Sequence, residues 1–138
     1  IMRSYEDSLQ RLGLNRAHLL LIHDLDFWFN ETEERVTAYL NQLYTRGWRA
    51  RDELKSTGCI KGIGAGINET GMIPRFFNYV PVDFFICAMP YNLLDQETLD
   101  VEFPLCEKHG AGIVIGAAFA SGILATGPVE GAGFAASC

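Results

Sequence analysis

The sequence is poor in basic residues. Lys and Arg number 11 against 17 Asp and Glu, which gives a formal net charge of -6 and an isoelectric point near 4.9. Proteins that bind nucleic acid use Lys and Arg to neutralise backbone phosphates. We therefore expect no nucleic-acid partner.

Cysteine and histidine are scarce and scattered. The chain has four cysteines without a CxxC pair and three scattered histidines, a pattern that disfavours a zinc site or a disulfide framework. We expect no metal. Cys59 and Cys87 stand in apolar runs, which is typical of a small buried residue. These features predict a reducing, cytoplasmic location.

Long hydrophobic runs are also missing. The most apolar stretch, residues 110–124, is rich in Gly and Ala and is shorter than the roughly 20 residues that cross a bilayer. The first residues show no basic segment followed by an apolar one, as a secretory signal would. We expect neither a membrane span nor a signal peptide.

What is present suits one globular domain over residues 1–138, with 49% hydrophobic and 20% charged residues. Short apolar runs alternate with segments whose apolar residues recur at helical spacing. Gly13 can end the first helix, Asn30 or Thr32 can cap the second, and Pro104 can kink or restart the last. The predicted helices are residues 2–12, 30–57, 69–79 and 95–109, and the predicted strands are residues 18–23, 60–65, 82–87 and 112–116.

Strict alternation of strand and helix predicts an α/β fold with a parallel sheet and right-handed crossovers, either doubly wound or a barrel. The apolar runs indicate strands buried on both faces. A barrel has eight strands, so this chain would supply four and leave two open sheet edges, through which it could self-associate. Beyond residue 127 the small residues have no period, and we expect an irregular segment there.

Ligands of parallel sheets bind at the carboxyl ends of the strands. His23 ends the first strand and could hydrogen-bond a substrate oxygen or transfer a proton, although it could equally bond a loop carbonyl. Asp24 and Asp26 are not expected to be catalytic and could cap the following structure. This rule nominates residues 23–26, 66–69, 89–92 and 117–121.

The glycines at positions 62, 64 and 66 do not form the G-x-G-x-x-G dinucleotide motif, because Ile67 and Glu69 occupy the places of the third glycine. Asn68 could recognise a carboxamide through its own amide, or could cap the helix from Glu69 onward. Tyr91 could stack or donate a hydrogen bond at a pocket mouth. The small residues at 117–127 could cradle a phosphate with backbone N–H groups.

Five blocks of the sequence carry a family resemblance: SLQRLG at 8–13, LLIH at 20–23, GCIKGIG at 58–64, PYNLL at 90–94 and SGILATG at 121–127. In this order and spacing they resemble the aldo-keto reductase family. The segment GAGINE at residues 64–69 is most similar to the branch that contains D-threo-aldose 1-dehydrogenase and pyridoxal 4-dehydrogenase.

This resemblance implies a partial (β/α)8 TIM barrel, about strands 4 to 7 with their helices, and an oxidoreductase that uses NADP or NAD. His23 matches the histidine that orients the substrate oxygen, and Asn68 matches the amide that holds the nicotinamide carboxamide. Asp24 and Tyr91 are the implied substrate-binding residues. The other implied cofactor-binding residues are Gly116 at the nicotinamide and, in the loop around the cofactor's diphosphate, Ala117, Phe119, Ser121, Gly122 and Leu124.

The implied reaction acts on a small sugar or aldehyde. Either a hydride passes from C1 of a cyclic aldose to NAD(P)+ to give a lactone, or an aldehyde and an alcohol are interconverted. The family's catalytic Tyr, Lys and Asp are expected upstream of residue 1, and its adenosine-phosphate site is expected beyond residue 138. The reaction is therefore expected of the intact parent protein, and the isolated chain is expected to be inactive. The alternatives are a catalytically incomplete piece that serves as a structural or partner-binding element, and a different phosphate-binding barrel.

Three positions depart from the family pattern. Ile67 stands where a Ser usually precedes the Asn, Ala88 stands where a Gln is usual, and Gly116 stands where an aromatic residue stacks on the nicotinamide. The loss of that aromatic ring affects the expected cofactor geometry.

Overall fold

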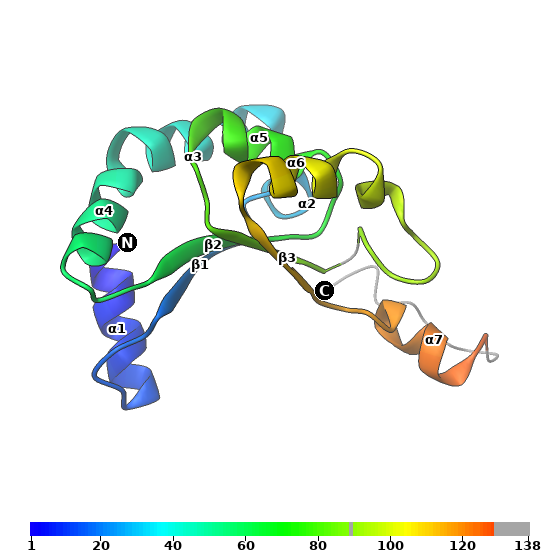
Figure 1. Ribbon diagram of the computed structural model, residues 1–138, viewed down its shortest axis with the longest axis horizontal. Coiled ribbons are helices and arrows are strands. Elements are labelled where there is room, and N and C mark those ends of the chain that lie inside the picture. Colours follow the sequence, from blue (N-terminus) through cyan, green and yellow to red (C-terminus); the bar gives the residue numbers. More distant parts are fainter. Residues whose placement is uncertain (89, 129–138) are drawn as a thin grey trace.

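The computed structural model describes residues 1–88 and 90–128. Met89, Cys138 and most of the irregular segment expected after residue 127 lie outside this part of the chain. The described residues form one sheet with helices over one of its faces (Figure 1).

The sheet has four parallel strands in the order of the sequence. Leu19 pairs with Gly62, Gly64 pairs with Phe84, and Phe84 pairs with Gly112. Within the described residues each outer strand has one neighbour. The strands are β1 (Leu19–His23), β2 (Gly62–Ile67), β3 (Phe84–Cys87) and β4 (Gly112–Ile115).

Each predicted helical region contains a helix, but two regions are broken into several elements. Gly13 ends the first helix with a left-handed φ of 64°, and Thr32 caps α3 by accepting a hydrogen bond from the backbone N–H of Arg35. The helices are α1 (Met2–Leu12), α2 (Phe27–Asn30), α3 (Glu33–Gln42), the π-helical turn η1 (Leu43–Gly47), α4 (Trp48–Ser56), α5 (Met72–Tyr79), the 3-10 turn η2 (Glu97–Leu99), α6 (Glu102–His109), the 3-10 turn η3 (Ala120–Gly122) and α7 (Ile123–Thr126).

The restart expected near Pro104 is confirmed, because η2 ends at Leu99 and α6 begins at Glu102. Pro104 lies in the first turn of α6, where its missing N–H costs little. No helix is predicted between the first strand and residue 30, yet α2 forms there. In the sequence this helix is hard to see, since its residues Phe27, Trp28 and Phe29 show no helical period.

The main core lies between the helices and the covered face of the sheet. Phe85 of β3 is fully buried and packs edge-on against Phe76 and Phe77 of α5, with ring centroids 5.9 and 5.4 Å apart. A second, smaller core joins Tyr5, Leu54 and Ile60, and the Tyr5 hydroxyl donates a hydrogen bond to the Cys59 carbonyl at 3.0 Å. α1 is thereby attached to the start of β2.

Burial on both faces, expected for all four strands, is found in β2 alone. Leu19 of β1 is 59% exposed and Val114 of β4 is 51% exposed. The expectation is wrong for the outer strands because each lacks a neighbour on one side and the sheet face opposite the helices has no cover within the described residues (Figure 1).

β2 has side chains on its helix-facing side and glycines on the other. Ile63, Ala65 and Ile67 are buried, whereas Gly64 and Gly66 lie beneath the side chains of neighbouring strands. A Cβ at Gly64 would come within 2.6 Å of the ring and the carbonyl oxygen of Phe84. This open face of the sheet is therefore made by side chains of β1 and β3 that lie across β2.

Asp83 ties the amino end of β3 to α4. Its carboxylate accepts hydrogen bonds from Lys55 Nζ at 2.8 Å, from the backbone N–H of Ile63 at 2.9 Å and from Arg51 at 3.4 Å. Burial opposes the charge, but the contacts with Lys55, Ile63 and Arg51 outweigh it and lower the pKa of Asp83. This contact stabilises the end of the sheet away from the candidate site.

The three described cysteines are free thiols. Cys87 and Cys106 are buried in the main core, as expected for Cys87, and Cys59 is half-buried. Burial, with the nearby charge of Glu102, raises the pKa of Cys87 to about 12 and that of Cys106 to about 11. Both are packing residues in the folded chain.

Candidate functional site

The loop after β1 is held by side chains of its own sequence. Asp26 caps α2 by accepting a hydrogen bond from the backbone N–H of Phe29 at 3.3 Å, which confirms the capping role considered for it. Asn30 donates from Nδ2 to the carbonyls of Asp24 and Asp26, at 3.0 and 2.7 Å. The loop is therefore fixed by the Asp26 carboxylate and by the backbone carbonyls of Asp24 and Asp26.

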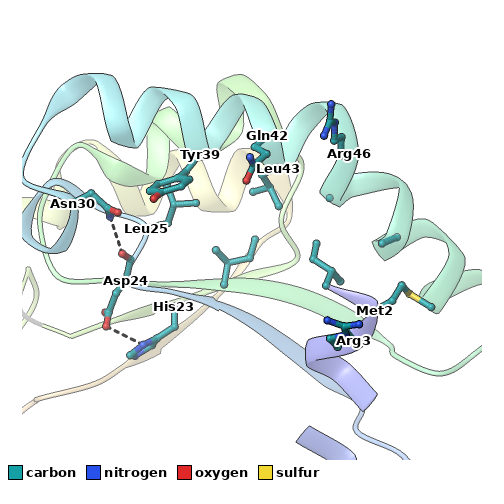
Figure 2. Close-up of a pocket in the computed structure, with 14 residues that line it drawn as sticks. Met2, Arg3, His23, Asp24, Leu25, Asn30, Tyr39, Gln42, Leu43 and Arg46 are labelled. Carbon is teal, nitrogen blue, oxygen red and sulfur yellow. Dashed lines mark hydrogen bonds and ion pairs between the residues drawn. The ribbon is translucent and has the colours of Figure 1, made fainter. Parts of the chain in front are cut away.

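His23 lies at the carboxyl end of β1 and pairs with Asp24. Its Nδ1 is 2.9 Å from Asp24 Oδ2, and its side chain is 71% exposed (Figure 2). The alternative of a bond to a loop carbonyl is wrong, because Nδ1 faces a carboxylate. With Nδ1–H bonded to Asp24, Nε2 is the ring nitrogen left for a ligand.

Two backbone features allow this arrangement. Asp24 has a φ of 53°, in the left-handed region, which carries its carboxylate back toward His23. Gly66 is the β2 partner of His23, and a Cβ there would lie 3.2 Å from His23 Cδ2. The His23 ring thus lies over a position without a side chain.

Asn68 follows β2 and is bonded to both carboxylates of the β1 loop. Its Nδ2 donates to Asp24 Oδ1 at 3.0 Å and to Asp26 Oδ2 at 2.9 Å, and its backbone N–H donates to the same Asp26 oxygen at 3.1 Å. The alternative that Asn68 caps the next helix is wrong, because Gly71 is the N-cap of α5. Asn68 instead joins two neighbouring strand ends.

The contact between Asp26 and Asn68 is the part of this network that the sequence analysis does not predict. Asp26 is fully buried, and its carboxylate accepts three N–H groups. The sequence feature that could have indicated it is the position of Asp26 between the apolar residues Leu25 and Phe27. A carboxylate that is buried in such a segment needs hydrogen-bond donors.

Two cavities adjoin this network. The larger, of about 830 Å³, runs along the free side of β1 between α1 and the α3–α4 segment, with His23, Asp24 and Asn30 at one end (Figure 2). The smaller, of about 400 Å³, lies at the carboxyl ends of the strands and is bordered by Asn68, Trp28, Pro90 and Ala120.

The loop after β4 carries the other predicted cofactor residues. Its backbone is left-handed at Ala117, Ala120, Ser121 and Gly122, with φ values of 47°, 46°, 56° and 100°. Phe119 is 65% exposed, and Gly116 and Leu124 are half-buried. Residues 112–128 contain no Lys or Arg, so an anion here would be bound by backbone N–H groups and the Ser121 hydroxyl.

Tyr91 lies against α6. Its ring centroid is 4.9 Å from that of Phe103, with an interplanar angle of 58°. The structure therefore brings together His23, Asp24 and Asn68, while Tyr91 contacts the helix layer.

Among residues 1–88 and 90–128 there is no group of three His, Cys, Asp or Glu side chains that could hold a metal ion. In the same part of the chain no helix has the length and apolar character needed to span a bilayer.

Known proteins are similar to this chain in sequence. Pyridoxal 4-dehydrogenase from Microbacterium luteolum is 40% identical over 127 residues, covering 91% of this chain and 36% of its own length. D-threo-aldose 1-dehydrogenase from a Pseudomonas species is 30% identical over 125 residues, covering 91% and 35%. The chain thus spans little more than a third of the length of these relatives.

Solved structures share the fold. An aldo-keto reductase from Bacillus halodurans superposes with a TM-score of 0.64 at 23% identity, covering 94% of this chain and 39% of its own. Glycerol dehydrogenase from Gluconobacter oxydans gives 0.60 at 21% identity, covering 96% and 36%. The four-stranded parallel sheet is thus part of a TIM barrel, as predicted. The sequence model of the aldo/keto reductase family matches residues 1–134, and the chain belongs to that family.

Proposed function

We propose that the intact protein to which these residues belong transfers hydride between NADP or NAD and a small molecule, acting on an aldehyde or alcohol carbon. The observation that carries this proposal is the bonded set His23–Asp24–Asn68 at the carboxyl ends of two adjacent strands. A group that can bond a substrate oxygen and a group that can bond a carboxamide lie on the two sides of one carboxylate.

The described residues fit a nicotinamide cofactor. Asn68 borders a cavity of about 400 Å³, within the range of small-molecule sites, and the loop of residues 116–124 offers backbone N–H groups for a diphosphate. When bound, the cofactor supplies the hydride acceptor or donor. The residues of this chain would hold the cofactor and the substrate in the relative orientation that hydride transfer requires.

His23 is the proposed catalytic residue. The Asp24 carboxylate fixes the ring through Nδ1, so Nε2 can bond the oxygen of the reacting carbon and orient it. Asp24 is already bonded to His23 and Asn68, which supports a role in holding these two side chains beside its predicted role in substrate binding.

The substrate class follows from the relatives. One 40% identical relative is named for pyridoxal and another, at 30%, for D-threo-aldoses. Both names fit oxidation of an aldehyde-level carbon, for an aldose at C1 to a lactone. We place the enzyme in the cytoplasm, in keeping with the free thiols Cys59, Cys87 and Cys106.

The test is NAD(P)H formation with pyridoxal, L-fucose and L-galactose in turn, measured by absorbance for the intact parent protein and its variants. We expect His23→Ala to lower kcat/KM by about 10²-fold or more, and Asn68→Ala to raise the KM for the cofactor. Asp52→Asn, an exposed carboxylate beside Arg51, is the control. Turnover at the rate of the unchanged protein in both site variants would refute these assignments.

A second candidate is that this chain acts as a partner-binding piece without catalysis. The exposed Leu19 and Val114 on the outer strands favour it. The absence of any nicotinamide-dependent turnover, together with association through these edges, would support this candidate over the first.

A further inference from the structure

The short helix α2 is held in place without a buried side chain. Its three consecutive aromatic residues, Phe27, Trp28 and Phe29, are 48%, 42% and 49% exposed. One turn of helix is too short to be stable in water by itself. The conformation of α2 therefore depends on the hydrogen bonds made at its ends.

Two carboxylates accept the backbone N–H groups at the start of α2. Asp26 accepts from Phe29 at 3.3 Å, and Glu69 Oε1 accepts from Phe27 at 2.5 Å. A hydrogen bond to an ionised carboxylate is stronger than one to a neutral acceptor. Glu69 lies just after β2, so its bond joins α2 to the end of a strand 42 residues away in the sequence.

Trp28 borders the cavity of about 400 Å³, together with Pro90 and Leu94. It is the one aromatic side chain among the described residues that line this cavity. An indole ring offers a broad, flat and apolar face. The cavity thus has an apolar wall, whose central element is carried by the helix that Glu69 holds.

The wall lies on the side of the molecule where the reaction is proposed to occur. Asn68 borders the same cavity, and Asp24 bonds both Asn68 and His23. A ligand that packs against Trp28 would therefore be close to the groups proposed to bind the reacting molecules.

A flat wall suits a substrate that contains a ring. A pyridine ring can stack on an indole, and the C–H groups on one face of a pyranose can pack against the same surface. A small acyclic aldehyde has no face of comparable area. Contact with Trp28 would thus stabilise the binding of cyclic substrates more than that of acyclic ones.

We infer that Trp28 is a specificity-determining residue that packs against the ring of a cyclic substrate, and that Glu69 is a positioning residue that acts through α2 to hold Trp28 in place. This inference rests on the proposed function and adds to it a preference for substrates with a flat apolar ring face.

The first experiment measures the KM values of the intact parent protein for pyridoxal, for L-fucose and for methylglyoxal, which is acyclic. We expect Trp28→Ala to raise the KM for a ring substrate about tenfold and Trp28→Phe to stay within about threefold. The KM values for methylglyoxal and for the cofactor should stay within about twofold. A rise with pyridoxal alone would assign the wall to planar aromatic rings, and a rise with L-fucose alone would assign it to pyranoses.

The second experiment tests whether Glu69 acts through Trp28. Glu69→Ala should raise the KM for the ring substrate about threefold, and Glu69→Gln, which keeps an oxygen acceptor for Phe27, should restore it. The double variant with Trp28→Ala and Glu69→Ala should be no worse than Trp28→Ala alone, because the two residues act as one unit. Glu107→Ala, on the exposed side of α6, is the control.

A third measurement needs no turnover. Hydrogen–deuterium exchange of a peptide covering residues 24–31 should become several-fold faster in Glu69→Ala and remain unchanged in Glu69→Gln, because Glu69 protects the Phe27 N–H. Peptides from β2 and β3 should exchange as before, which would show that the fold is kept.

Ring-substrate KM values that stay unchanged in Trp28→Ala would overturn the inference and leave the proposed function standing. Additive losses in the double variant, or an equal rise of the cofactor KM in Glu69→Ala, would overturn the role of Glu69. Unchanged exchange in Glu69→Ala would do the same. If no substrate is turned over with either cofactor, the proposed function fails together with the role of Trp28.

Discussion

Glu102 is a charged side chain inside the helix layer, 3% exposed. Its Oε1 accepts a hydrogen bond from the backbone N–H of Gly71 at 2.7 Å, whereas its Oε2 has no partner among the described residues. Burial raises the pKa of Glu102, although backbone N–H groups of Gly71 and Ile73 act against it. Its charged form is therefore less favourable in the folded chain than in the unfolded one.

The sign of the pH effect follows. Because the pKa of Glu102 is higher in the folded chain than in the unfolded one, the neutral carboxyl contributes to stability, and this contribution is complete below the unfolded pKa. It is lost as the pH rises through the folded pKa. Glu102→Gln keeps an acceptor for Gly71 and removes the charge. We expect it to raise the unfolding free energy near pH 8 by about 1–3 kcal/mol, and by less near pH 4.

Urea unfolding followed by circular dichroism at several pH values measures this difference. Glu107→Gln, on the exposed side of the same helix, is the matched control and should keep the original pH dependence. A Glu102→Gln protein with an unchanged pH slope would show that the buried carboxyl does not control it.

At the scale of elements, β2 depends on having no side chain at Gly64. Gly64 and Gly112 both pair with Phe84, one on each side of β3. A Cβ at Gly64 would meet Phe84 at 2.6 Å, including its carbonyl oxygen, whereas at Gly112 the nearest atom is 3.6 Å away. The two glycines thus differ in the space around them while sharing a partner.

We expect Gly64→Ala to lower the unfolding free energy by about 1–3 kcal/mol or more, because backbone must move. Gly112→Ala should change it by no more than about 0.5 kcal/mol. Thermal and urea unfolding of the two variants measure both values. Equal losses of unfolding free energy in the two variants would mean that the close contact between Phe84 and Gly64 does not determine the cost of adding a side chain.

The types of most helices and strands could be predicted from the sequence, but their boundaries could not. Ile60 extends the apolar run before β2, yet it packs with Tyr5 and Leu54, so the strand begins at Gly62. Hydrophobicity marks burial and not the start of strand pairing. For the same reason the run at β1 suggested burial on both sides, since edge position depends on neighbours that the run does not encode.

The candidate site could be predicted in part. The rule that ligands meet the carboxyl ends of parallel strands nominated Asp24 and Asn68 for one region, although 44 residues separate them. The bonding pattern could not be read from sequence, because it depends on the left-handed backbone of Asp24 and the burial of Asp26. Nothing in the spacing of these residues specifies either feature.

At the scale of the whole molecule, the outer strands of the sheet carry exposed apolar side chains at its open edges. Val114 on β4 is 51% exposed, and such an edge can pair with another chain. We expect the protein to associate as its concentration rises, and Val114→Lys to weaken that association.

Sedimentation velocity over a range of concentrations measures the association. Val101→Lys makes the same substitution at a residue that is 64% exposed just before α6, away from the strands, and should leave it unchanged. A monomer at every concentration, or equal effects of both substitutions, would contradict an interface at the β4 edge.

The order of the strands also bears on how the chain acquires its fold. Because β1, β2, β3 and β4 neighbour one another in the order in which they are synthesised, each new strand pairs with the one made just before it. No strand has to wait for a distant segment, so loop closure stays short. The sheet can therefore grow one βα unit at a time as the polypeptide leaves the ribosome.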